Sequence, residues 1–291
     1  MPNVRAVPTL RRRRLGNALR GHRRDARLSL GAAAGPMGWD ESKLSRIETG
    51  QARIQPQFIA PLLRQYGVGD PEVVGALEEL ARDAGRRGWW AGYGNLVDLS
   101  YRDYLTLETD ALGTQVYSPG VVPGLLQTGR YAREVIAGTS TRPPEEIASL
   151  AHLHGTRQAV LTSRDNGLPP LRLWAVIHEG VFYQRFAAGP ALMREQLRHL
   201  LEVSELPHVT VQVMPLTAPP HPGLLGLFEI IRFKHPSPPV VNLETVRGGH
   251  FVEGADDVRR FEEAFERIAA TALPADDSRT RIAHLIDRTR P

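Results

Sequence analysis

The stretch from Leu30 to Gly50 constrains the fold more than any other part of the chain. Asp40 is suited to cap a helix, because its carboxylate can accept the unpaired N–H groups of the following turn. Trp39 and Leu44 stand at the two positions of a hydrophobic staple around that cap. Gly50 is placed to end the helix in the left-handed conformation. The pattern predicts two short helices, the second of which begins at Asp40.

The second of these helices has one apolar face. Leu44 and Ile47 are three residues apart and therefore point to the same buried side. The residues that face other directions or lie at the rim are Glu41, Ser42, Lys43, Ser45 and Arg46. Two helices joined at Gly38, the second facing outward, form the pattern of a helix-turn-helix, whose second helix lies in the DNA major groove. The alternative is an ordinary packed pair of helices.

The first helix of the pair contains poor helix formers. Gly31, Gly35 and Pro36 lie within it, and an interior Gly costs about 1 kcal/mol and an interior Pro about 3 kcal/mol relative to Ala. We therefore expect this helix to be short or to end in a distorted turn.

The run Ser-Lys-Leu-Ser-Arg-Ile-Glu-Thr-Gly at 42–50 closely resembles the recognition helix of the Xre-type family, which includes the phage repressors. The resemblance implies that Glu41, Ser42 and Arg46 face the bases of double-stranded DNA, with Lys43 and Ser45 near phosphates. Arginine in such a position can make a bidentate contact to guanine. The predicted DNA-binding residues are Glu41, Ser42, Lys43, Ser45, Arg46 and Arg53.

The resemblance also implies a structural pair between Arg23 and Glu48, which would tie the first helix of the domain to the third. Arg27 departs from the family pattern, because it stands where relatives prefer a glycine.

Charge is distributed unevenly along the chain. The net charge of the 291 residues is +4, but residues 1–64 carry +9 and the remainder carries −5. A basic N-terminal segment followed by a mildly acidic remainder is typical of a polyanion-binding domain joined to a domain that does not contact DNA. Within this segment, the run from Arg11 to Arg14 either follows phosphates or is a solvated face.

The organisation of the chain predicts two domains. The helix-turn-helix domain spans 1–84 and ends before the linker Gly-Arg-Arg-Gly at 85–88, and the C-terminal domain spans 85–291. Apolar residues from Phe58 to Tyr66 predict a fourth helix, and Asp70-Pro71 predicts the start of a fifth.

The C-terminal domain mixes helices with strands. We expect one helix over 98–117 and further helices over 145–164, 191–204, 258–272 and 278–288. Strand composition occurs at 171–177, 208–214, 226–233 and 240–246. The expected fold class is α+β overall: an all-α domain of five helices, then a mixed α/β domain with a small sheet of about four strands.

Several motifs occur in a fixed order: Trp-Trp at 89, Pro-Gly-Leu-Leu-Gln-Thr at 123, His-Glu-Gly at 178 and Gly-Leu-Leu-Gly-Leu-Phe-Glu-Ile at 223. This order is similar to the C-terminal domain of WhiJ-like regulators from high-GC filamentous bacteria. The resemblance implies transcriptional control and a small partner protein encoded nearby, in an arrangement likened to toxin and antitoxin.

Enzymatic patterns are incomplete, and we expect no enzyme. His178-Glu179 begins like a metalloprotease helix, but Phe182 occupies the position of the second histidine. We interpret His208, His221 and His235 as surface histidines rather than a metal site. Gly248-Gly249 lacks the spacing of a phosphate-binding loop and is better explained by a tight turn. Glu108, Glu179 and Glu244 could form a carboxylate group, but pairing with arginines is the simpler expectation.

Two roles remain for the C-terminal domain. Dimerisation with partner binding is favoured, because a homodimer doubles the contacts of a short half-site. The alternative role is the binding of a small molecule in a pocket of this domain. The aromatic residues that would line the pocket are Trp89, Trp90, Tyr117, Trp174, Phe182 and Tyr183. The candidate residues for a partner or ligand are Trp89, Trp90, Tyr117, Gln127 and Glu179.

Composition limits the remaining classes. The chain has no cysteine, which excludes disulfides and thiolate chemistry. No apolar run approaches the about 18 residues that a bilayer span needs, and no apolar stretch follows the basic N-terminal residues as in a secretory signal. We expect a cytoplasmic protein with no cofactor and no metal.

Overall fold

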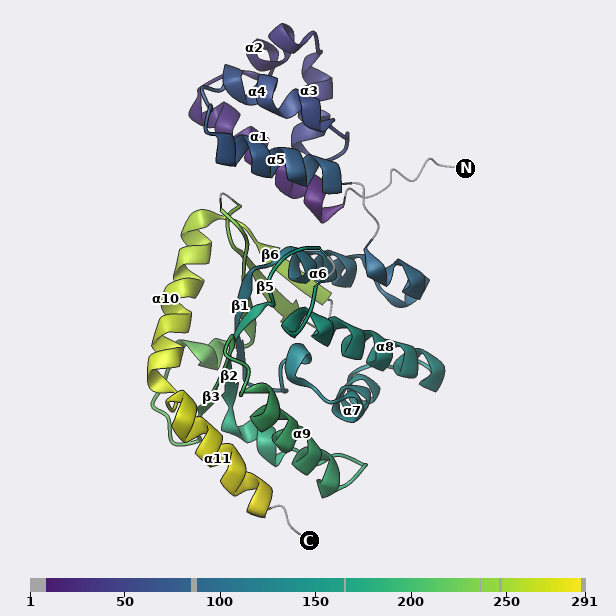
Figure 1. Ribbon diagram of the computed structural model, residues 1–291, viewed down its shortest axis with the longest axis vertical. Coiled ribbons are helices and arrows are strands. Elements are labelled where there is room, and N and C mark those ends of the chain that lie inside the picture. Colours follow the sequence, from purple (N-terminus) through teal and green to yellow (C-terminus); the bar gives the residue numbers. More distant parts are fainter. Residues whose placement is uncertain (1–8, 85–87, 165, 236, 246–247, 289–291) are drawn as a thin grey trace. The chain divides into compact units, whose positions relative to one another are not determined.

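The computed structural model describes residues 9–84, 88–164, 166–235, 237–245 and 248–288 (Figure 1). The chain forms two compact units: the first consists of residues 1–91 and 234–237, and the second of residues 92–233 and 238–291. Of the predicted linker at 85–88, residues 85–87 lie outside the described part of the chain.

The first unit contains the five expected helices among its described residues. They are α1 (Leu10–Asp25), α2 (Leu30–Ala34), α3 (Glu41–Glu48), α4 (Ile59–Gln65) and α5 (Pro71–Asp83). Short 3-10 turns follow α2, as η1 (Gly35–Met37), and precede α4, as η2 (Pro56–Phe58). Apolar residues from all five helices form one core, with the side chains of Leu19, Leu44, Leu62 and Leu63 fully buried.

Local chemistry determines where the two central helices begin and end. Asp40 caps α3, because its carboxylate accepts the N–H of Lys43 at 2.6 Å. Gly38 and Gly50 both have left-handed backbone, with φ of 67° and 74°. The prediction of a short first helix is confirmed, since α2 has five residues and passes into the 3-10 turn that contains Pro36.

Arg27 is the one described residue other than glycine with a positive φ, at 56°. This is the position at which relatives of the Xre type prefer glycine. The left-handed region costs about 1–2 kcal/mol for a residue with a Cβ, so the departure seen in the sequence carries a local strain.

Helices α1 and α3 approach each other at a glycine. A Cβ on Gly16 would lie 2.5 Å from the carbonyl oxygen of Glu48 and 2.6 Å from that of Ile47. The absence of a side chain at Gly16 therefore allows the end of α3 to rest directly on α1. Gly21 lies on the same helix but has no atom within 4 Å of the corresponding position.

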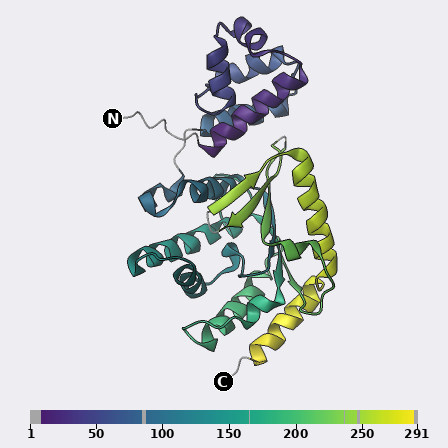
Figure 2. The same cartoon turned by 180° about the vertical axis from the view of Figure 1, so that it is seen from behind.

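The second unit combines helices with a six-stranded sheet (Figures 1 and 2). Its strands are β1 (Gly113–Ser118), β2 (Arg172–His178), β3 (Val209–Met214), β4 (Phe228–Arg232), β5 (Val240–Thr245) and β6 (Gly248–Val252). Its helices are α6 (Leu99–Asp110), α7 (Gly129–Thr139), α8 (Pro144–Arg157), α9 (Pro190–Val203), α10 (Ala255–Thr271) and α11 (Ala275–Arg288).

Short 3-10 segments lie between these elements. They are η3 (Trp89–Leu96), η4 (Gly124–Leu126), η5 (Gln158–Leu161), η6 (Glu179–Tyr183) and η7 (Pro222–Leu225). Of these, η3 crosses the boundary between the two units.

The expectation of about four strands is corrected to six. The four predicted strands are present as β2 to β5, with bounds close to those expected. The predicted helix over 98–117 is wrong beyond Asp110, because Ala111 takes extended backbone and the chain continues as β1. The predicted tight turn at Gly248-Gly249 is displaced: both glycines begin β6, and Gly248 pairs with Thr245 at the end of β5.

The strands lie in the order β3-β2-β1-β4-β5-β6. The first three are parallel to one another, and β4, β5 and β6 each run antiparallel to the preceding strand in that order. Helices α6 to α9 cover one face and α10 covers the other (Figures 1 and 2).

The two faces of the sheet differ in polarity. Because side chains alternate along a strand, Tyr117, Val176 and Phe228 point toward α10 and form an apolar core with Phe265. Their neighbours Val116 and Glu229 point to the opposite face. We therefore expect the polar side chains of a functional site on this second face of the sheet.

No helix in the described ranges is both long and apolar enough to cross a bilayer.

The approach at Gly16 gives a stability prediction. Replacing Gly16 by Ala should lower the free energy of unfolding of the first unit by about 1–3 kcal/mol, because the added methyl group meets backbone that cannot move aside. Replacing Gly21 by Ala should raise it by up to about 1 kcal/mol, as expected for a helix interior. Hydrogen–deuterium exchange of the α1 and α3 amides in the full-length protein measures both changes in the free energy of unfolding. Equal effects of Gly16→Ala and Gly21→Ala would contradict the close contact of α1 with α3 at Gly16.

Candidate functional site

Helix α3 presents a polar surface to solvent. Leu44 and Ile47 are buried, whereas Ser42 and Arg46 are exposed and Ser45 is half-buried. Ser42 donates to the capping carboxylate of Asp40 at 2.8 Å. The side of the helix that the sequence assigns to DNA is thus free of the unit's core.

Two cations on α3 are held in defined positions. Arg46 donates from Nε to the carbonyl oxygen of Ser42 at 3.2 Å, and no bond to a described residue engages its two terminal nitrogens. These two nitrogens are the pair that a bidentate contact to guanine requires. The ammonium of Lys43 lies 4.3 Å from the centroid of the Trp39 ring, a cation–π contact that steadies it at the rim.

Glu41 and Arg53 take different positions. Glu41 is exposed, but its side chain reaches back to α2: a Cβ on Gly31 would lie 2.3 Å from Glu41 Oε1. Arg53 is exposed beyond the end of α3. Burial, followed by the charge of Arg53, lowers the pKa of Arg12. The two arginines therefore form a local concentration of positive charge.

The four arginines at 11–14, at the start of α1, differ in their burial. Arg11 and Arg14 are buried, and Arg11 Nη1 donates to the carbonyl oxygen of Asp83 on α5 at 3.4 Å. Arg12 and Arg13 are half-buried. The run is therefore neither a continuous phosphate-binding strip nor a solvated face.

The pair of Arg23 and Glu48 is confirmed. Arg23 donates from Nε to Glu48 Oε1 at 2.6 Å and from Nη2 to Oε2 at 2.8 Å. Arg23 also donates to the carbonyl oxygen of Leu28 at 2.7 Å. Both charged side chains are buried, so this bidentate contact joins α1 to α3 from within the unit.

The aromatic residues predicted to line a pocket lie outside the cavity described below. Tyr117 is buried on the α10 face, where its ring meets the ring of His221 edge-on. Trp174 donates to Gln212 at 2.6 Å, Phe182 is buried, and Tyr183 donates to Glu179 at 3.0 Å. Trp89 and Trp90 pack against each other. None of these side chains lines the cavity described below.

Glu179 and Gln127, the other two candidates, have different surroundings. Glu179 is buried; it accepts from Arg281 Nε at 2.9 Å and from the N–H of Leu216 at 3.2 Å. Although burial opposes them, these hydrogen bonds lower the pKa of Glu179. Gln127 follows η4 and lies in the lining of the cavity.

The three histidines considered for a metal site lie in separate environments. His235 is exposed, and His208 bonds from Nε2 to the carbonyl oxygen of Leu161 at 2.7 Å. The expectation of a surface position is wrong for His221, which is buried and accepts from the N–H of Gly223. Among the residues described, no three acidic, histidine or cysteine side chains group in a way that could hold a metal ion.

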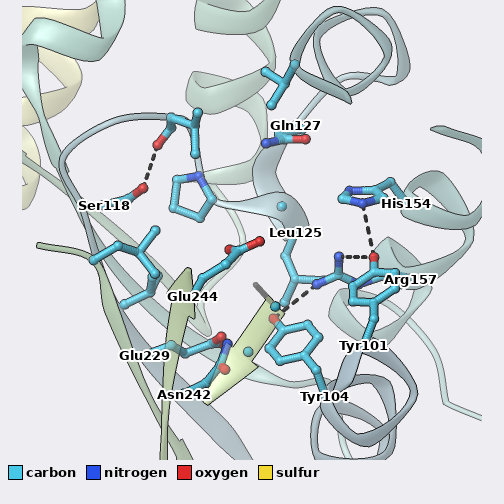
Figure 3. Close-up of a pocket in the computed structure, with 18 of the residues that line it drawn as sticks. Tyr101, Tyr104, Ser118, Leu125, Gln127, His154, Arg157, Glu229, Asn242 and Glu244 are labelled. Carbon is cyan, nitrogen blue, oxygen red and sulfur yellow. Dashed lines mark hydrogen bonds between the residues drawn. The ribbon is translucent and has the colours of Figure 1, made fainter. Parts of the chain in front are cut away.

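A cavity of about 290 Å3 lies on the polar face of the sheet (Figure 3). Its floor is formed by cross-strand neighbours: Val116 on β1 is opposite Glu229 on β4, and Glu229 is opposite Asn242 on β5. Helices α6, α7 and α8 and the loop after β1 form its walls. The cavity therefore lies near the carboxyl ends of β1 and β5, the edge at which sheets with parallel strands commonly bind ligands.

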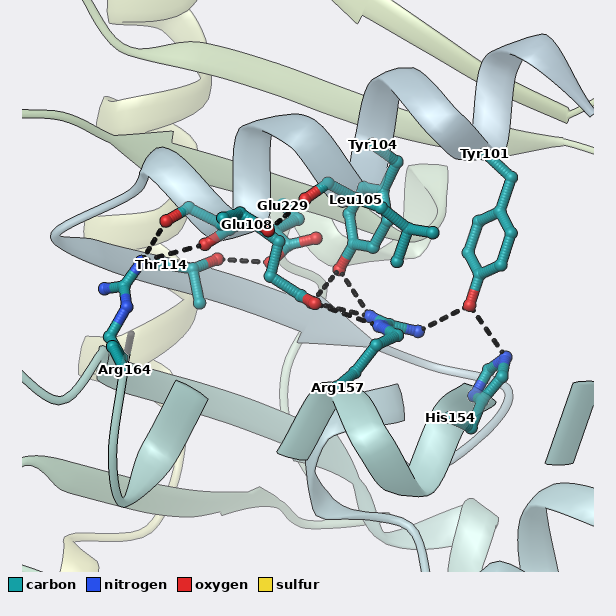
Figure 4. A network of polar contacts seen from close by, with 10 residues as sticks. Tyr101, Tyr104, Leu105, Glu108, Thr114, His154, Arg157, Arg164 and Glu229 are labelled. Atoms are coloured by element: carbon teal, nitrogen blue, oxygen red, sulfur yellow. Dashed lines mark hydrogen bonds and ion pairs between the residues drawn. The ribbon is translucent and has the colours of Figure 1, made fainter. Parts of the chain in front are cut away.

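A buried network supports one wall of the cavity (Figure 4). Arg157 on α8 forms an ion pair with Glu108 on α6, with Nε at 2.9 Å from Oε1 and Nη2 at 2.6 Å from Oε2. Arg157 also donates to the hydroxyls of Tyr101 at 2.9 Å and Tyr104 at 3.0 Å. The Tyr101 oxygen lies 3.0 Å from Nε2 of His154. Arg157 thereby contacts three side chains of α6 directly, and His154 joins the network through Tyr101.

Burial determines the protonation states in this network. Desolvation raises the pKa of Tyr101 to about 12 and lowers the pKa of His154 to about 3, so both are neutral at neutral pH. Desolvation also raises the pKa of Glu229 to about 7, although a hydrogen bond from Thr114 opposes the shift. Glu229 is thus the carboxyl group in the cavity that changes charge near neutral pH.

Sequence reasoning missed most of this site. Glu108 was considered as a carboxylate and paired with an arginine, as the structure confirms, but Tyr101, Tyr104 and His154 had no motif to join them. A local signal existed for β1, because Thr-Gln-Val-Tyr after Gly113 is β-rich. Recognising it would have brought the end of α6 next to the sheet.

The raised pKa of Glu229 gives a pH prediction. The folded protein holds the proton more tightly than the unfolded chain, in which the pKa is near 4.5. Stability should therefore fall by about 3 kcal/mol as pH rises from about 4.5 to about 7, and Glu229→Gln should remove this loss. Denaturant unfolding across that range measures it, with Glu266→Gln, on the exposed side of α10, as the control. Parallel curves for the wild type and Glu229→Gln would show that the carboxyl is not perturbed.

Comparison with known proteins agrees with the two units. Residues 14–77 match the family described as a helix-turn-helix domain, and residues 101–284 match the family described as a domain of unknown function, DUF5753. No curated protein and no solved structure matches the chain. The second match covers more than half of the sequence, and the chain therefore belongs to the DUF5753 family, with a helix-turn-helix domain ahead of the family's own domain.

Proposed function

We propose that this protein is a sequence-specific DNA-binding transcriptional regulator in which α3 lies in the major groove. The observation that carries the proposal is the surface of α3. Its apolar face is buried, while Ser42 and Arg46 are exposed and the terminal nitrogens of Arg46 have no hydrogen-bond partner in the described ranges. The match to a helix-turn-helix domain supports the same assignment.

Electrostatics supports the proposal independently of the helix geometry. Residues 1–64 carry a net charge of +9, and Lys43, Arg46 and Arg53 are on or just beyond α3. Phosphate contacts position a protein on DNA, whereas contacts to base edges give specificity. We assign Lys43, Ser45 and Arg53 to phosphates and Ser42 and Arg46 to bases. Glu41 is kept as a base-facing candidate, and to reach a base its side chain must leave Gly31.

The finer assignment follows from sequence resemblance. The recognition helix resembles the Xre type, and the motifs of the C-terminal domain resemble WhiJ-like regulators. On that basis we propose that the C-terminal domain dimerises the protein and receives a small protein partner encoded nearby. A dimer doubles the base contacts at a fixed spacing, which compensates for the short half-site that one helix reads. We propose that this regulator is located in the cytoplasm, where it binds DNA.

We further propose that the C-terminal domain is not an enzyme. Two of the three carboxylates considered for acid–base chemistry are engaged with arginines, Glu108 with Arg157 and Glu179 with Arg281. The third, Glu244, is exposed. These pairs favour a structural role for the carboxylates over proton transfer.

The test is selection of bound DNA from fragmented genomic DNA of the source organism by the purified full-length protein. A regulator should enrich a small set of fragments that share a two-fold symmetric motif. Enrichment that is uniform across the genome, or none at low salt, would refute the proposal.

Arg46 gives a prediction for specificity. Replacing Arg46 by Ala should cost about 1–3 kcal/mol at the selected site and relax the preference at one base position in each half-site, because the bidentate contact is lost. Arg46→Lys keeps the charge without the bidentate geometry and should also relax that position. Binding measured against a set of single-base variants tests this, and an unchanged base preference in Arg46→Ala would contradict the assigned role.

Lys43 gives a prediction for salt dependence. Replacing Lys43 by Ala should weaken binding to all sequences alike and reduce the slope of log K against log salt by about 1 per contacted phosphate. Arg82 on α5 is an exposed arginine of the same unit, and Arg82→Ala should leave the slope unchanged. Titrations at several salt concentrations measure both slopes; a base-specific loss in Lys43→Ala would reassign this residue.

A further inference from the structure

The cavity on the sheet contains buried polar atoms that the protein leaves unpaired. Gln127 and Asn242 both line it and are 5 % and 6 % exposed. Gln127 Oε1 and Asn242 Oδ1 have no hydrogen-bond partner within the described part of the chain. Leaving a buried polar group unpaired is unfavourable, so two such acceptors in one cavity indicate a binding function.

A hydrogen bond from its nitrogen atom fixes the orientation of the Gln127 side-chain amide. Its Nε2 donates to the carbonyl oxygen of Val122 at 2.7 Å. The oxygen therefore remains as a hydrogen-bond acceptor. A ligand group that pairs with Gln127 must therefore be a hydrogen-bond donor.

The charges around the cavity disfavour an anion. Arg157 is the cationic side chain in the described lining, and its guanidinium already donates to Glu108, Tyr101 and Tyr104. The buried carboxylate of Glu108 balances its charge. His154 is neutral because of its burial. A carboxylate or phosphate would therefore enter without a free counter-charge.

Acidic groups face the same space. Figure 3 shows the carboxyl of Glu244 from β5 among the lining residues, above Glu229 and Asn242. Glu244 is exposed and has no ion pair with a described cation. Asp98 is also an exposed carboxylate of the lining, but it caps α6 and accepts from the N–H of Tyr101 at 2.8 Å. A ligand cation near Glu244 would meet a charge that no described cation pairs with.

The remaining wall is apolar. Leu125 and Val121 come from the loop after β1, Val135 and Ile136 from α7, and Leu173 from β2. The cavity volume is at the lower end of the range of about 300–1000 Å3 that is usual for ligand sites. These observations favour a small molecule with a short hydrocarbon body.

We propose that this cavity binds a small amphipathic amine, with its ammonium group toward Glu244, Asn242 and Gln127 and its hydrocarbon part against α7 and Leu173. The site lies within the second unit, and binding to it is a property separate from the reading of DNA by α3. The network around Arg157 acts as the rigid wall that keeps the acceptors in place.

The experiment uses the full-length protein and two sets of probes with matched shape and different charge. They are phenethylamine, phenethyl alcohol and phenylacetate, and hexylamine, hexanol and hexanoate. Saturation-transfer NMR and thermal-shift assays without DNA measure binding. At least one amine should bind with a Kd of about 1 mM or lower and more tightly than its alcohol and its carboxylate by about tenfold.

Three variants locate the binding. Asn242→Leu removes a buried acceptor, and Glu244→Gln removes the exposed charge; each should weaken amine binding by about tenfold. Glu134→Gln removes a carboxylate on α7 outside the lining and should leave binding unchanged. Asn242→Leu should also keep the free protein folded, because it replaces an unpaired acceptor by a group of similar shape.

Any of four results would overturn the proposal. The first three are the failure of both amines to bind at about 1 mM, equal or tighter binding of the carboxylates, and equal affinity of the wild type and both cavity variants. Loss of binding in Glu134→Gln would place the amine elsewhere and would overturn it as well. None of these readings depends on DNA binding, so the two proposals can fail separately.

Discussion

In each unit of this protein a buried ion pair between an arginine and a glutamate joins two helices. Arg23 and Glu48 join α1 to α3, and Arg157 and Glu108 join α8 to α6. Removal of one partner from a buried pair leaves an uncompensated charge and costs about 3–5 kcal/mol. In each unit the pair also fixes an element to which a function is proposed: helix α3 in the first, and one cavity wall in the second.

Side chains alternate along the strands of the sheet, and this alternation gives the second unit two different faces. Tyr117 and Phe228 point to α10 and build an apolar core, while Val116 and Glu229, one residue away, point to α6 and the cavity. Stability can therefore be concentrated on the α10 face. The opposite face can then contain buried polar groups that a core of apolar residues alone would exclude, such as Glu229 with its pKa of about 7.

Local interactions explain which predictions are confirmed. The cap at Asp40, the buried faces of α3 and α5 and the left-handed Gly50 depend on neighbours within a few residues, and the sequence displays them directly. Strands β1 and β6 were missed for the opposite reason. β1 follows α6 after two residues and is held by β2 and β4, which are distant in sequence, and β6 begins with two glycines that resemble a turn.

The amino-acid sequence alone determined the helix-turn-helix, the residues of α3 that face outward, the four strands β2 to β5 and the absence of thiol chemistry. Only the tertiary structure decided that Tyr117 belongs to a core, that Glu108 meets Arg157, and that Gln127, Asn242 and Glu244 surround one cavity. The physical reason is range: a cap or an apolar stripe is complete within one or two turns of chain. A cavity exists only after strands and helices more than a hundred residues apart have packed together.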